Sequence, residues 1–446
     1  MMYIDNILFA IILVVGIGFF SKNVKKLKRN INLGHNINRN DNPSARLRNM
    51  AMIALGQSKM VKKPIAGFLH IIVYAGFIII NIEVLEIIID GLFGTHRVFS
   101  FLGGFYGFLI ASFEILAVLV LVAVIIFWIR RNIIKLKRFV SSDLKGSPKK
   151  DADTILYFEI VLMSLFLIMN ATDLHFQAMN SGNIISQFIN PWFSSLDIAQ
   201  VEAIEMITWW MHITGILIFL NYLYYSKHLH ILLAFPNTYF ADLNPKGQFD
   251  NLESVTKEVK LMMDPNADPF AAQPVDETRG ETELSEANAI PIKFGASDVQ
   301  DLNWVQLLNA YTCTECGRCT SSCPANQTGK KLSPRKIMMD TRDRLEEVSK
   351  NIDTNKGVFI PDNKSLLNDY ITAEELWACT SCNACVEECP VNISPLSIII
   401  DMRRYLVMEK SAAPQTLNAM MTNIENNGAP WQYNQQDRLN WKNENN

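Results

Sequence analysis

The sequence predicts an all-α protein, in which a bundle of five transmembrane helices precedes a smaller helical domain. Three observations favour this class. Hydrophobic residues make up 49% of the 446 residues, and they are concentrated before residue 235. The eight cysteines fall into two short groups in the last third of the chain. The segments after each group begin with Ser-Pro and carry apolar residues at helical spacing.

Five apolar stretches are candidate spans, since a transmembrane helix needs about 20 predominantly apolar residues. They cover residues 4–20, 65–89, 105–129, 155–171 and 204–230. The first is short and carries Asp5. We interpret it as an uncleaved anchor rather than a signal peptide, because it lacks a basic n-region and a small-residue cleavage site. A lysine-rich stop at Lys22, Lys25, Lys26 and Lys28 also follows it.

The charge pattern predicts the orientation of these spans. Residues 21–64 carry many Lys and Arg but only one acid, Asp41, and residues 130–138 are also basic. Residues 171–206 contain no Lys or Arg. By the positive-inside rule, both basic segments and everything after the fifth span are cytoplasmic. We therefore expect a multi-pass protein of the inner cell membrane, in contact with membrane lipid, with its N-terminus outside. The net charge of -3 gives no reason to expect nucleic acid.

Three regions follow the membrane domain, which covers residues 1–243. Residues 244–298 are polar and contain Pro, Asp and Glu without hydrophobic periodicity, which predicts an extended tether or an arm along a partner. Residues 299–410 form the cysteine-containing domain, whose segments SPRKIMMDTRDRLEEV and SPLSIIIDMRRYLVMEK indicate helices. The tail, 411–446, is rich in Asn and Gln, and it is partly disordered or packs on a partner.

The cysteines repeat one ligand pattern, C-x2-C-x2-C-x3-C-P. The first copy is Cys313, Cys316, Cys319, Cys323 and Pro324, and the second is Cys379, Cys382, Cys385, Cys389 and Pro390. This pattern predicts two [4Fe-4S] clusters, with the fourth cysteine of each motif ligating the other cluster. One cluster then takes Cys313, Cys316, Cys319 and Cys389, and the other takes Cys379, Cys382, Cys385 and Cys323. Structural zinc is the alternative, but zinc sites usually present cysteines as two separated pairs. A disulfide framework fits a reducing compartment less well.

Histidines in or near the spans predict a second cofactor. The seven are His35, His70, His96, His175, His212, His228 and His230. In one continuous helix, His212 and His230 would share a face about 27 Å apart, with His228 rotated by about 200° from His230. His70 lies at the depth of His230, so this pair predicts a bis-histidine b-type haem. A possible second haem b pairs His212 with His175, which we prefer to His96. For each histidine, a hydrogen-bonded residue without a ligand role is the alternative.

Two stretches resemble known membrane proteins. MHITGILIFLNYLYYSKHLHILLAFPNTYF and ALGQSKMVKKPIAGFLHIIVYAGF resemble haem-binding spans of the gamma subunit of respiratory nitrate reductase and of the membrane subunit of heterodisulfide reductase. Ile80 stands where the nitrate reductase subunit has its second histidine. The resemblance thus implies a five-helix transmembrane haem-binding bundle followed by an α-helical 2[4Fe-4S] ferredoxin domain.

The C-terminal part resembles another family. FGASDVQDLNWVQLLNAYTCTECGRCTSSCP and ELWACTSCNACVEECPVNISPLSIIIDMRRYLV resemble the ferredoxin-like part of heterodisulfide-reductase-related iron-sulfur oxidoreductases, including proteins proposed to link electron-transfer flavoprotein to quinone. Such proteins usually continue into cysteine-rich CCG domains, whereas no cysteine follows Cys389. The resemblance implies that a CCG-type iron-sulfur subunit or electron-transfer flavoprotein is the partner.

These observations predict a membrane-bound electron-transfer subunit of a quinone-linked iron-sulfur oxidoreductase complex. It would pass electrons between a cytoplasmic redox partner and the quinone pool. No GxGxxG element predicts a flavin or nicotinamide site, and no catalytic residue is predicted. The acids Glu83, Glu86, Glu114 and Glu205 face the outer side, either as part of a quinone site or paired with Arg97 or one another. The alternatives are a non-catalytic redox sensor or scaffold and a heterodisulfide or thiol reductase subunit.

Overall fold

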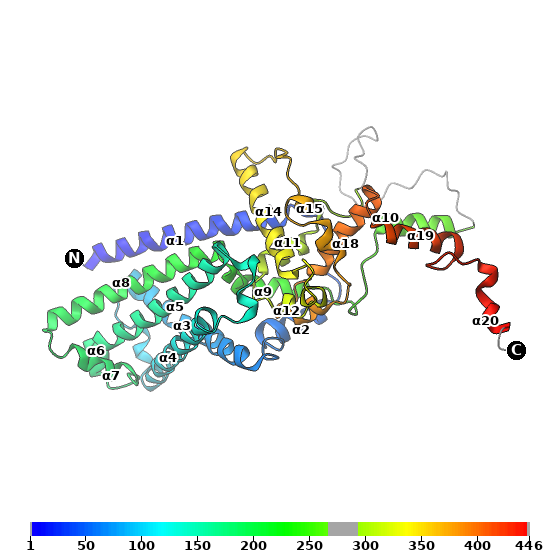
Figure 1. Cartoon of the computed structure of the whole chain (residues 1–446). Coiled ribbons are helices and arrows are strands. Elements are labelled where there is room, and N and C mark those ends of the chain that lie inside the picture. Colours follow the sequence, from blue (N-terminus) through cyan, green and yellow to red (C-terminus); the bar gives the residue numbers. More distant parts are fainter. Residues whose placement is uncertain (1, 266–292, 444–446) are drawn as a thin grey trace.

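The structure, a computed structural model, describes residues 2–265 and 293–443. Within these residues there are helices, turns and two isolated β-bridges but no β-strand, so the all-α prediction is confirmed. Figure 1 shows a bundle of long helices with the cysteine-containing domain packed at one end. We call that end of the bundle the near end, and the opposite end, where the N-terminus lies, the far end.

Five helices are long and apolar enough to cross a membrane. They are α1 (Met2–Ile31), α3 (Pro64–Phe93), α4 (Gly104–Asn132), α5 (Ser147–Thr172) and α8 (Ile198–Tyr222). Each predicted span overlaps one of them. The helices extend beyond the apolar runs because their polar ends are also helical. For example, α1 continues through the lysine-rich segment, where Lys26 and Arg29 pair with Asp353 of the cysteine domain.

Local signals explain where these helices begin and end. Proline occupies the first turn of α3 and of α5, where a missing backbone N–H costs little. Asp197 and Gln200 form a capping box at the start of α8. Gly94 ends α3 in the left-handed conformation, with φ 69°.

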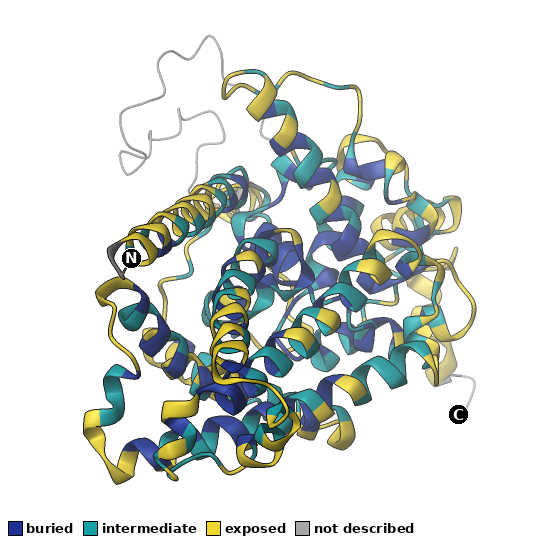
Figure 2. Ribbon diagram, turned by 90° about the vertical axis from the view of Figure 1, so that its left-hand side faces the viewer, coloured by how far each residue is buried: buried dark blue, intermediate teal, exposed yellow. Residues whose placement is uncertain are grey.

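The membrane helices form an arc. Helix α3 packs on α4, α4 on α5 and α5 on α8, while α1 packs on both α3 and α8. Buried apolar residues fill the arc, among them Tyr106, Ile110, Phe113, Ile155, Phe166 and Ile213. Figure 2 shows many exposed residues along the outer faces of the long helices, and large apolar side chains such as Val14, Phe68 and Phe108 are among them. Such faces suit a lipid surround.

The prediction of one helix over 204–230 is wrong beyond residue 222. After α8 the chain forms a 3-10 turn (Leu223–Tyr225), an extended residue at Ser226, a second 3-10 turn (Lys227–Leu229) and then α9 (His230–Tyr239). The Ser226 hydroxyl accepts a hydrogen bond from the backbone N–H of His228, and the N–H of Lys227 donates to Asp151. These bonds replace the bonds of a continuous helix, so His212 and His230 do not share one helix face.

The cysteine domain is built from short helices around the long helix α14 (Pro334–Thr354). The others are α11 (Trp304–Thr312), α12 (Arg318–Ser321), α13 (Pro324–Gln327), α15 (Leu366–Asp369), α16 (Ala373–Trp377), α17 (Ala384–Glu388) and α18 (Pro395–Arg404). Their core includes Leu302, Leu307, Ile337, Leu345 and Ile398. The same core contains Leu27 of α1 and Leu233 of α9. The core of the cysteine domain therefore includes residues from the near end of the membrane domain.

Polar contacts strengthen this junction. The Asn30 amide donates to the Tyr311 hydroxyl at 2.8 Å, and the Asn237 amide donates to the Val391 carbonyl at 2.7 Å. After α1, the backbone of His35 pairs with the residues around Asn303. The near end is thus fixed to the cysteine domain along several segments, among them α2 (Pro43–Met50), which packs on α9.

The predicted linker and tail contain further helices. Part of the linker forms α10 (Glu253–Met263), while residues 266–292 lie outside the described residues. The tail forms α19 (Gln415–Asn427) and α20 (Asn440–Asn443), and it extends away from the bundle in Figure 1. Two short helices, α6 (Leu174–Ala178) and α7 (Ser186–Ile189), close the far end.

Candidate redox site

The two cysteine motifs fold into equivalent loops. Cys313 directly follows α11, and Cys379 follows α16. Positive φ angles recur at equivalent positions, two and four residues after the first cysteine: Glu315 (53°), Gly317 (72°), Ser381 (54°) and Asn383 (60°). This conformation turns successive backbone N–H groups to one side, as in anion-binding loops. The two copies of the sequence motif therefore have the same backbone conformation.

Four cysteines gather around the first loop. Burial raises the pKa of the Cys319 thiol, and the charges of nearby Cys316, Cys313, Cys389 and Cys385 raise it further. Cys313, Cys316, Cys319 and Cys389, which the motif assigns to one cluster, line one small cavity. Cys385 of the second motif and the apolar side chains of Met338 and Ile393 also line it.

The remaining cysteines gather around the second loop. Burial raises the pKa of Cys385 to about 12, and the charges of Cys379, Cys323 and Cys382 act in the same direction. The fourth cysteine of each motif thus lies with the first three of the other. Backbone N–H groups of Ser381 and Ile393 donate to the sulfurs of Cys379 and Cys389 at 3.4 and 3.3 Å. Such bonds stabilise ligated sulfur, so both sets fit four-iron clusters.

The two sets differ in exposure. Cys382 of the second set is exposed, whereas Cys313 and Cys389 of the first set are buried. Both motifs contact the chain just before α3, since Arg318 donates to the Lys59 carbonyl at 3.2 Å and the Lys59 ammonium donates to the Val386 carbonyl at 3.3 Å. The exposed Cys382 is therefore what distinguishes the second set.

A buried ion pair joins the first loop to residues 227–230, which carry His228 and His230 and which we call the histidine segment. Lys227 Nζ lies 2.5 Å from Glu315 Oε2, and Arg342 lies 2.9 Å from the other carboxylate oxygen. Burial alone would raise the pKa of Glu315, but these two cations outweigh burial and lower the pKa. The carbonyl of Lys227 also accepts a hydrogen bond from His230 Nδ1 at 3.0 Å. Lys227 thus contacts both the cysteine loop and His230.

Three histidines gather at the near end. The rings of His228 and His230 are 5.6 Å apart, and burial followed by the charges of His230, Lys227 and His70 lowers the pKa of His228. The Nδ1 atom of His70 is buried without a hydrogen-bond partner. Because His230 Nδ1 donates to a carbonyl, its Nε2 is left free, which is the usual arrangement of a metal-binding histidine. His70 and His230 therefore fit as haem ligands, and the helix break brings His228 close to them.

The structure does not bring His212 and His175 together. His212 is 1% exposed and lies against Phe166 inside the bundle. His175 is exposed on α6, 5.4 Å from the His96 ring. Glu205, which lies near His96, precedes His212 by seven residues, or about 10 Å along α8. Among the described residues no second histidine contacts His212, so a second bis-histidine haem does not fit there.

The acids at the far end divide into two groups. Glu86 and Glu114 have structural partners, since Glu86 accepts from the Tyr106 hydroxyl at 3.0 Å and Glu114 accepts from the backbone of Ile185 at 2.7 Å. Glu83 is 3% exposed, and its Oε2 has no hydrogen-bond partner. Glu83 and Glu205 line a cavity of about 270 Å³.

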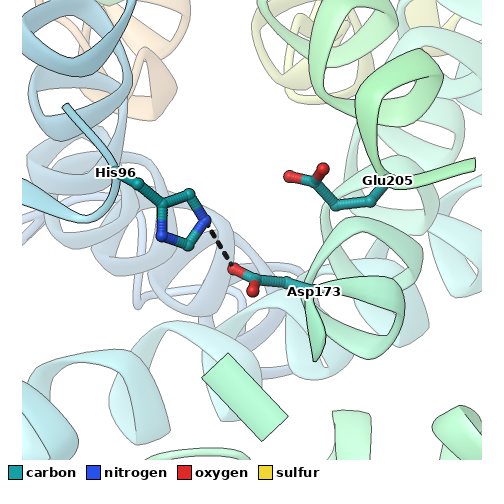
Figure 3. Close-up of side chains that lie close together, drawn as sticks. All are labelled: His96, Asp173 and Glu205. Carbon is teal, nitrogen blue, oxygen red and sulfur yellow. Dashed lines mark ion pairs between the residues drawn. The ribbon is translucent and has the colours of Figure 1, made fainter. Parts of the chain in front are cut away.

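The predicted alternative partner, Arg97, pairs with Asp173 at 2.7 Å. Figure 3 shows that His96 also points to this carboxylate, at 3.2 Å, with Glu205 opposite. The hydrogen bond with Asp173 raises the pKa of His96. Potential ligand atoms of His96, Asp173 and Glu205 lie within 4.8 Å of one another, but the oxygen of Asp173 nearest His96 already accepts from Arg97. Arg97 and Asp173 therefore form a structural pair.

Sequence reasoning missed two features of this site. The first is the pair of Lys227 and Glu315, and the second is the position of His228 beside His230. A lysine next to two histidines and an acid between two cluster cysteines are visible in the sequence, but their contact depends on how the two domains pack.

Comparison with known proteins agrees with this geometry. The family model described as "4Fe-4S dicluster domain" matches residues 309–393. The fold and the two cysteine sets define an iron-sulfur electron-transfer protein with five membrane-length helices.

Two relatives match nearly the whole chain. The chain is 30% identical over 471 residues to "Probable iron-sulfur-binding oxidoreductase FadF" of Bacillus subtilis, covering 99% of this chain and 61% of that protein. It is 25% identical over 439 residues to "EtfAB:quinone oxidoreductase" of Syntrophomonas wolfei, covering 92% of this chain and 55% of that protein. The chain thus spans less than two thirds of either relative.

A third relative matches a shorter part. "Probable membrane-anchored ferredoxin" of Chromohalobacter salexigens is 32% identical over 174 residues, covering 36% of this chain and 25% of that protein. No solved structure matches the chain.

Proposed function

We propose that this chain is the membrane subunit of a quinone-linked iron-sulfur oxidoreductase. It carries electrons between a soluble redox partner and the membrane quinone pool, through two [4Fe-4S] clusters and one b-type haem. The observation that carries this proposal is the shared core at the near end. There the cysteine set around Cys313 lies beside His70 and His230.

The exposure of the two cysteine sets gives the order of electron transfer. Cys379, Cys382, Cys385 and Cys323 hold the cluster next to the partner, because Cys382 reaches the surface. Cys313, Cys316, Cys319 and Cys389 hold the cluster next to the bundle, because Glu315, between Cys313 and Cys316, pairs with Lys227 beside the histidines. Electrons enter or leave the soluble side at the second set and pass to the membrane through the first.

His70 and His230 are the proposed haem ligands. A b-type haem between them would supply one-electron chemistry at the level of the near end. The Lys227 carbonyl fixes the His230 ring through Nδ1, and the Glu315 carboxylate fixes Lys227. The cysteine loop and the histidine segment thus hold each other in position.

The charge distribution supports a cytoplasmic cysteine domain. The basic segments 21–64 and 130–138 lie at the near end, where Arg29 contacts Asp353 and the Arg138 carbonyl accepts from Arg335. Residues 171–206, which lack Lys and Arg, include α6 and α7 at the far end. The positive-inside rule then gives an outer N-terminus and a cytoplasmic partner.

Two classes of partner fit this arrangement. A CCG-type iron-sulfur subunit is one, because all eight cysteines of this chain belong to the two sets. Electron-transfer flavoprotein is the other, in view of the name of the Syntrophomonas relative. A heterodisulfide or thiol reductase activity within this chain is disfavoured, because no cysteine is left for it.

The test uses the full chain in lipid nanodiscs. We expect about eight irons per chain in clusters and one haem. Menadiol should reduce the haem and the clusters, whereas turnover with a soluble donor should require the added partner. Stoichiometric zinc in place of the clusters would contradict the proposal, because zinc carries no electrons. A protein with clusters but without haem would favour a redox sensor or scaffold. Turnover by the chain alone would show that the substrate site lies in this chain.

A further inference from the structure

Helices α3 and α8 face each other across a slot rather than through close packing. Each of them packs on a different helix of the arc, α3 on α4 and α8 on α5. Within the slot lies a cavity of about 80 Å³. Its polar lining comes from three helices: Asn81 of α3, Glu159 of α5 and His212 of α8. Its walls include Phe77, Met163 and Phe219.

His212, which lines this cavity, has a buried nitrogen atom without a hydrogen-bond partner. The side chain is 1% exposed, and its Nδ1 atom has no hydrogen-bond partner. A buried polar atom left unpaired destabilises the protein, so a ligand that hydrogen-bonds to it is favoured. Ile80 lines the same cavity on α3 and cannot ligate a metal. The slot at His212 therefore suits an organic ligand with polar oxygens and not a bis-histidine haem.

The size of the cavity, its polar ends and its opening limit which ligands it can bind. At roughly 10–15 Å³ for each water-sized site, its volume of about 80 Å³ corresponds to about five to eight such sites, and a six-membered ring with two oxygens has about eight non-hydrogen atoms. His212 contacts Phe166, and Phe158, next to Glu159, contacts Phe219. His212 thus lies toward the far end of the cavity, and Glu159 toward the near end. Phe77 and Asn81 are exposed on the bundle surface, so a ligand can enter sideways from lipid.

The position along α3 distinguishes this cavity from the larger one at Glu83. Gly76 and Ile80 follow His70 by six and ten residues, or about 9 and 15 Å along the helix axis. Glu83 follows His70 by thirteen residues, or about 20 Å. Electron transfer falls steeply with distance, so the cavity at His212 is the better place for a redox ligand.

We propose that this slot binds the headgroup of a quinone or quinol, with one ring oxygen on His212 and the other on Glu159. The proposal rests on the proposed function and adds the location of its membrane substrate. On oxidation, both O–H bonds of the quinol break, and His212 and Glu159 accept the two protons. The clusters and the haem of the proposed function would accept the two electrons, one at a time. On quinone reduction, the same groups return the two protons.

The first test measures binding alone. The full chain in nanodiscs is illuminated with a photoreactive azidoquinone, and the labelled peptides are identified. We expect label on α3 near Phe77 and Asn81 and on α8 near His212. Ile80→Phe, which fills the cavity, should abolish this label. Ile78→Phe, on the lipid-facing side of α3, should retain it, since Ile78 is 49% exposed. Label confined to the Glu83 cavity, or equal label in both variants, would overturn the site.

The second test measures reduction by menadiol. His212→Leu and Glu159→Gln each remove a proton acceptor, so each should lower kcat for menadiol by at least tenfold. His212→Leu also removes a hydrogen bond, worth about 1 kcal/mol, and should in addition raise KM about fivefold. Both variants should keep the cluster iron and the dithionite-reduced haem band, which shows that they fold.

The outcomes separate the site from the function. If menadiol fails to reduce the unchanged protein, the proposed function falls and this site with it. If menadiol reduces the unchanged protein and both variants with equal KM and kcat, only the site is wrong. Loss of a second haem in His212→Leu would also overturn the site, because it would make His212 a haem ligand.

Discussion

Glu315 is a buried carboxylate inside the loop that carries Cys313 and Cys316. Its carboxylate forms ion pairs with Lys227 of the histidine segment and with Arg342 of α14. A buried charge that loses its partners costs about 3–5 kcal/mol, more than an exposed pair contributes. This one residue therefore affects both the cysteine loop and the position of His230.

Glu315→Gln should destabilise the protein by about 3–5 kcal/mol, because Lys227 and Arg342 both lose their buried partner. Lys227→Met should cost less, because Glu315 keeps Arg342. The measurement is the urea midpoint at which cluster absorbance is lost. Because the pKa of Glu315 is lowered, its ion pairs contribute fully above its ordinary pKa of 4.5 and are lost only as pH falls through the lower folded value.

A matched control is the exposed pair of Lys331 and Glu374. Lys331→Met removes a lysine of the same domain without burying a charge, so its urea midpoint should not change. Equal midpoints for Glu315→Gln and the unchanged protein would show that the buried network has no structural role.

The fourth cysteine of each motif gives a second prediction at this scale. Cys323→Ser should remove the same EPR signal as Cys382→Ser, because both thiols belong to the second set. Cys389→Ser should instead match Cys316→Ser. The EPR spectra of the four reduced variants show which cysteines share a cluster. A Cys323→Ser spectrum that matches Cys316→Ser would mean that each motif holds its own cluster.

The break between α8 and α9 is the element on which the histidine arrangement depends. The eighteen-residue spacing of His212 and His230 equals five helical turns, so the sequence favours one long helix. The break arises because Ser226 caps a new turn and Asp151 of α5 accepts the Lys227 N–H. Asp151 is far away in the sequence, and this contact could not be inferred from local periodicity.

Changing His70 or His230 to Ala should abolish the haem α-band and leave the cluster EPR signals. His228→Ala should keep the band, because only His230 has its Nδ1 bonded to the Lys227 carbonyl. His35→Ala is the control, since His35 is exposed and pairs through its backbone. Reduced spectra of the four purified variants provide the measurement. A band lost in His228→Ala and kept in His230→Ala would mean that His228, and not His230, is the haem ligand.

Elements with a strong local pattern could be predicted from the sequence. The five long helices follow from apolar runs, and the two cysteine loops follow from spacing, because each depends on neighbouring residues. His175 could not be assigned, because its position against His96 depends on how α6 folds over the far end. The same limit applies to Lys227 and Glu315, whose contact joins two domains.

At the scale of the whole molecule, the proposed five spans would place the two termini on opposite sides of the membrane. A tag at the N-terminus should be accessible to a membrane-impermeant reagent in intact cells, and a tag at the C-terminus only after lysis. The basic segments at the near end give this direction. Reversed accessibility would move the cysteine domain and its partner outside, and equal accessibility would exclude five spans.

The shared core of α9, α1 and the cysteine domain has a mechanical consequence. When an electron-transfer domain must move between donor and acceptor, its rate depends on solvent viscosity. Here Leu27 and Leu233 lie in the same core as Leu307, so the cysteine domain cannot rotate without opening that core. We therefore expect electron transfer between the two domains to need no movement of the cysteine domain, and its rate to be the same in concentrated glycerol as in buffer.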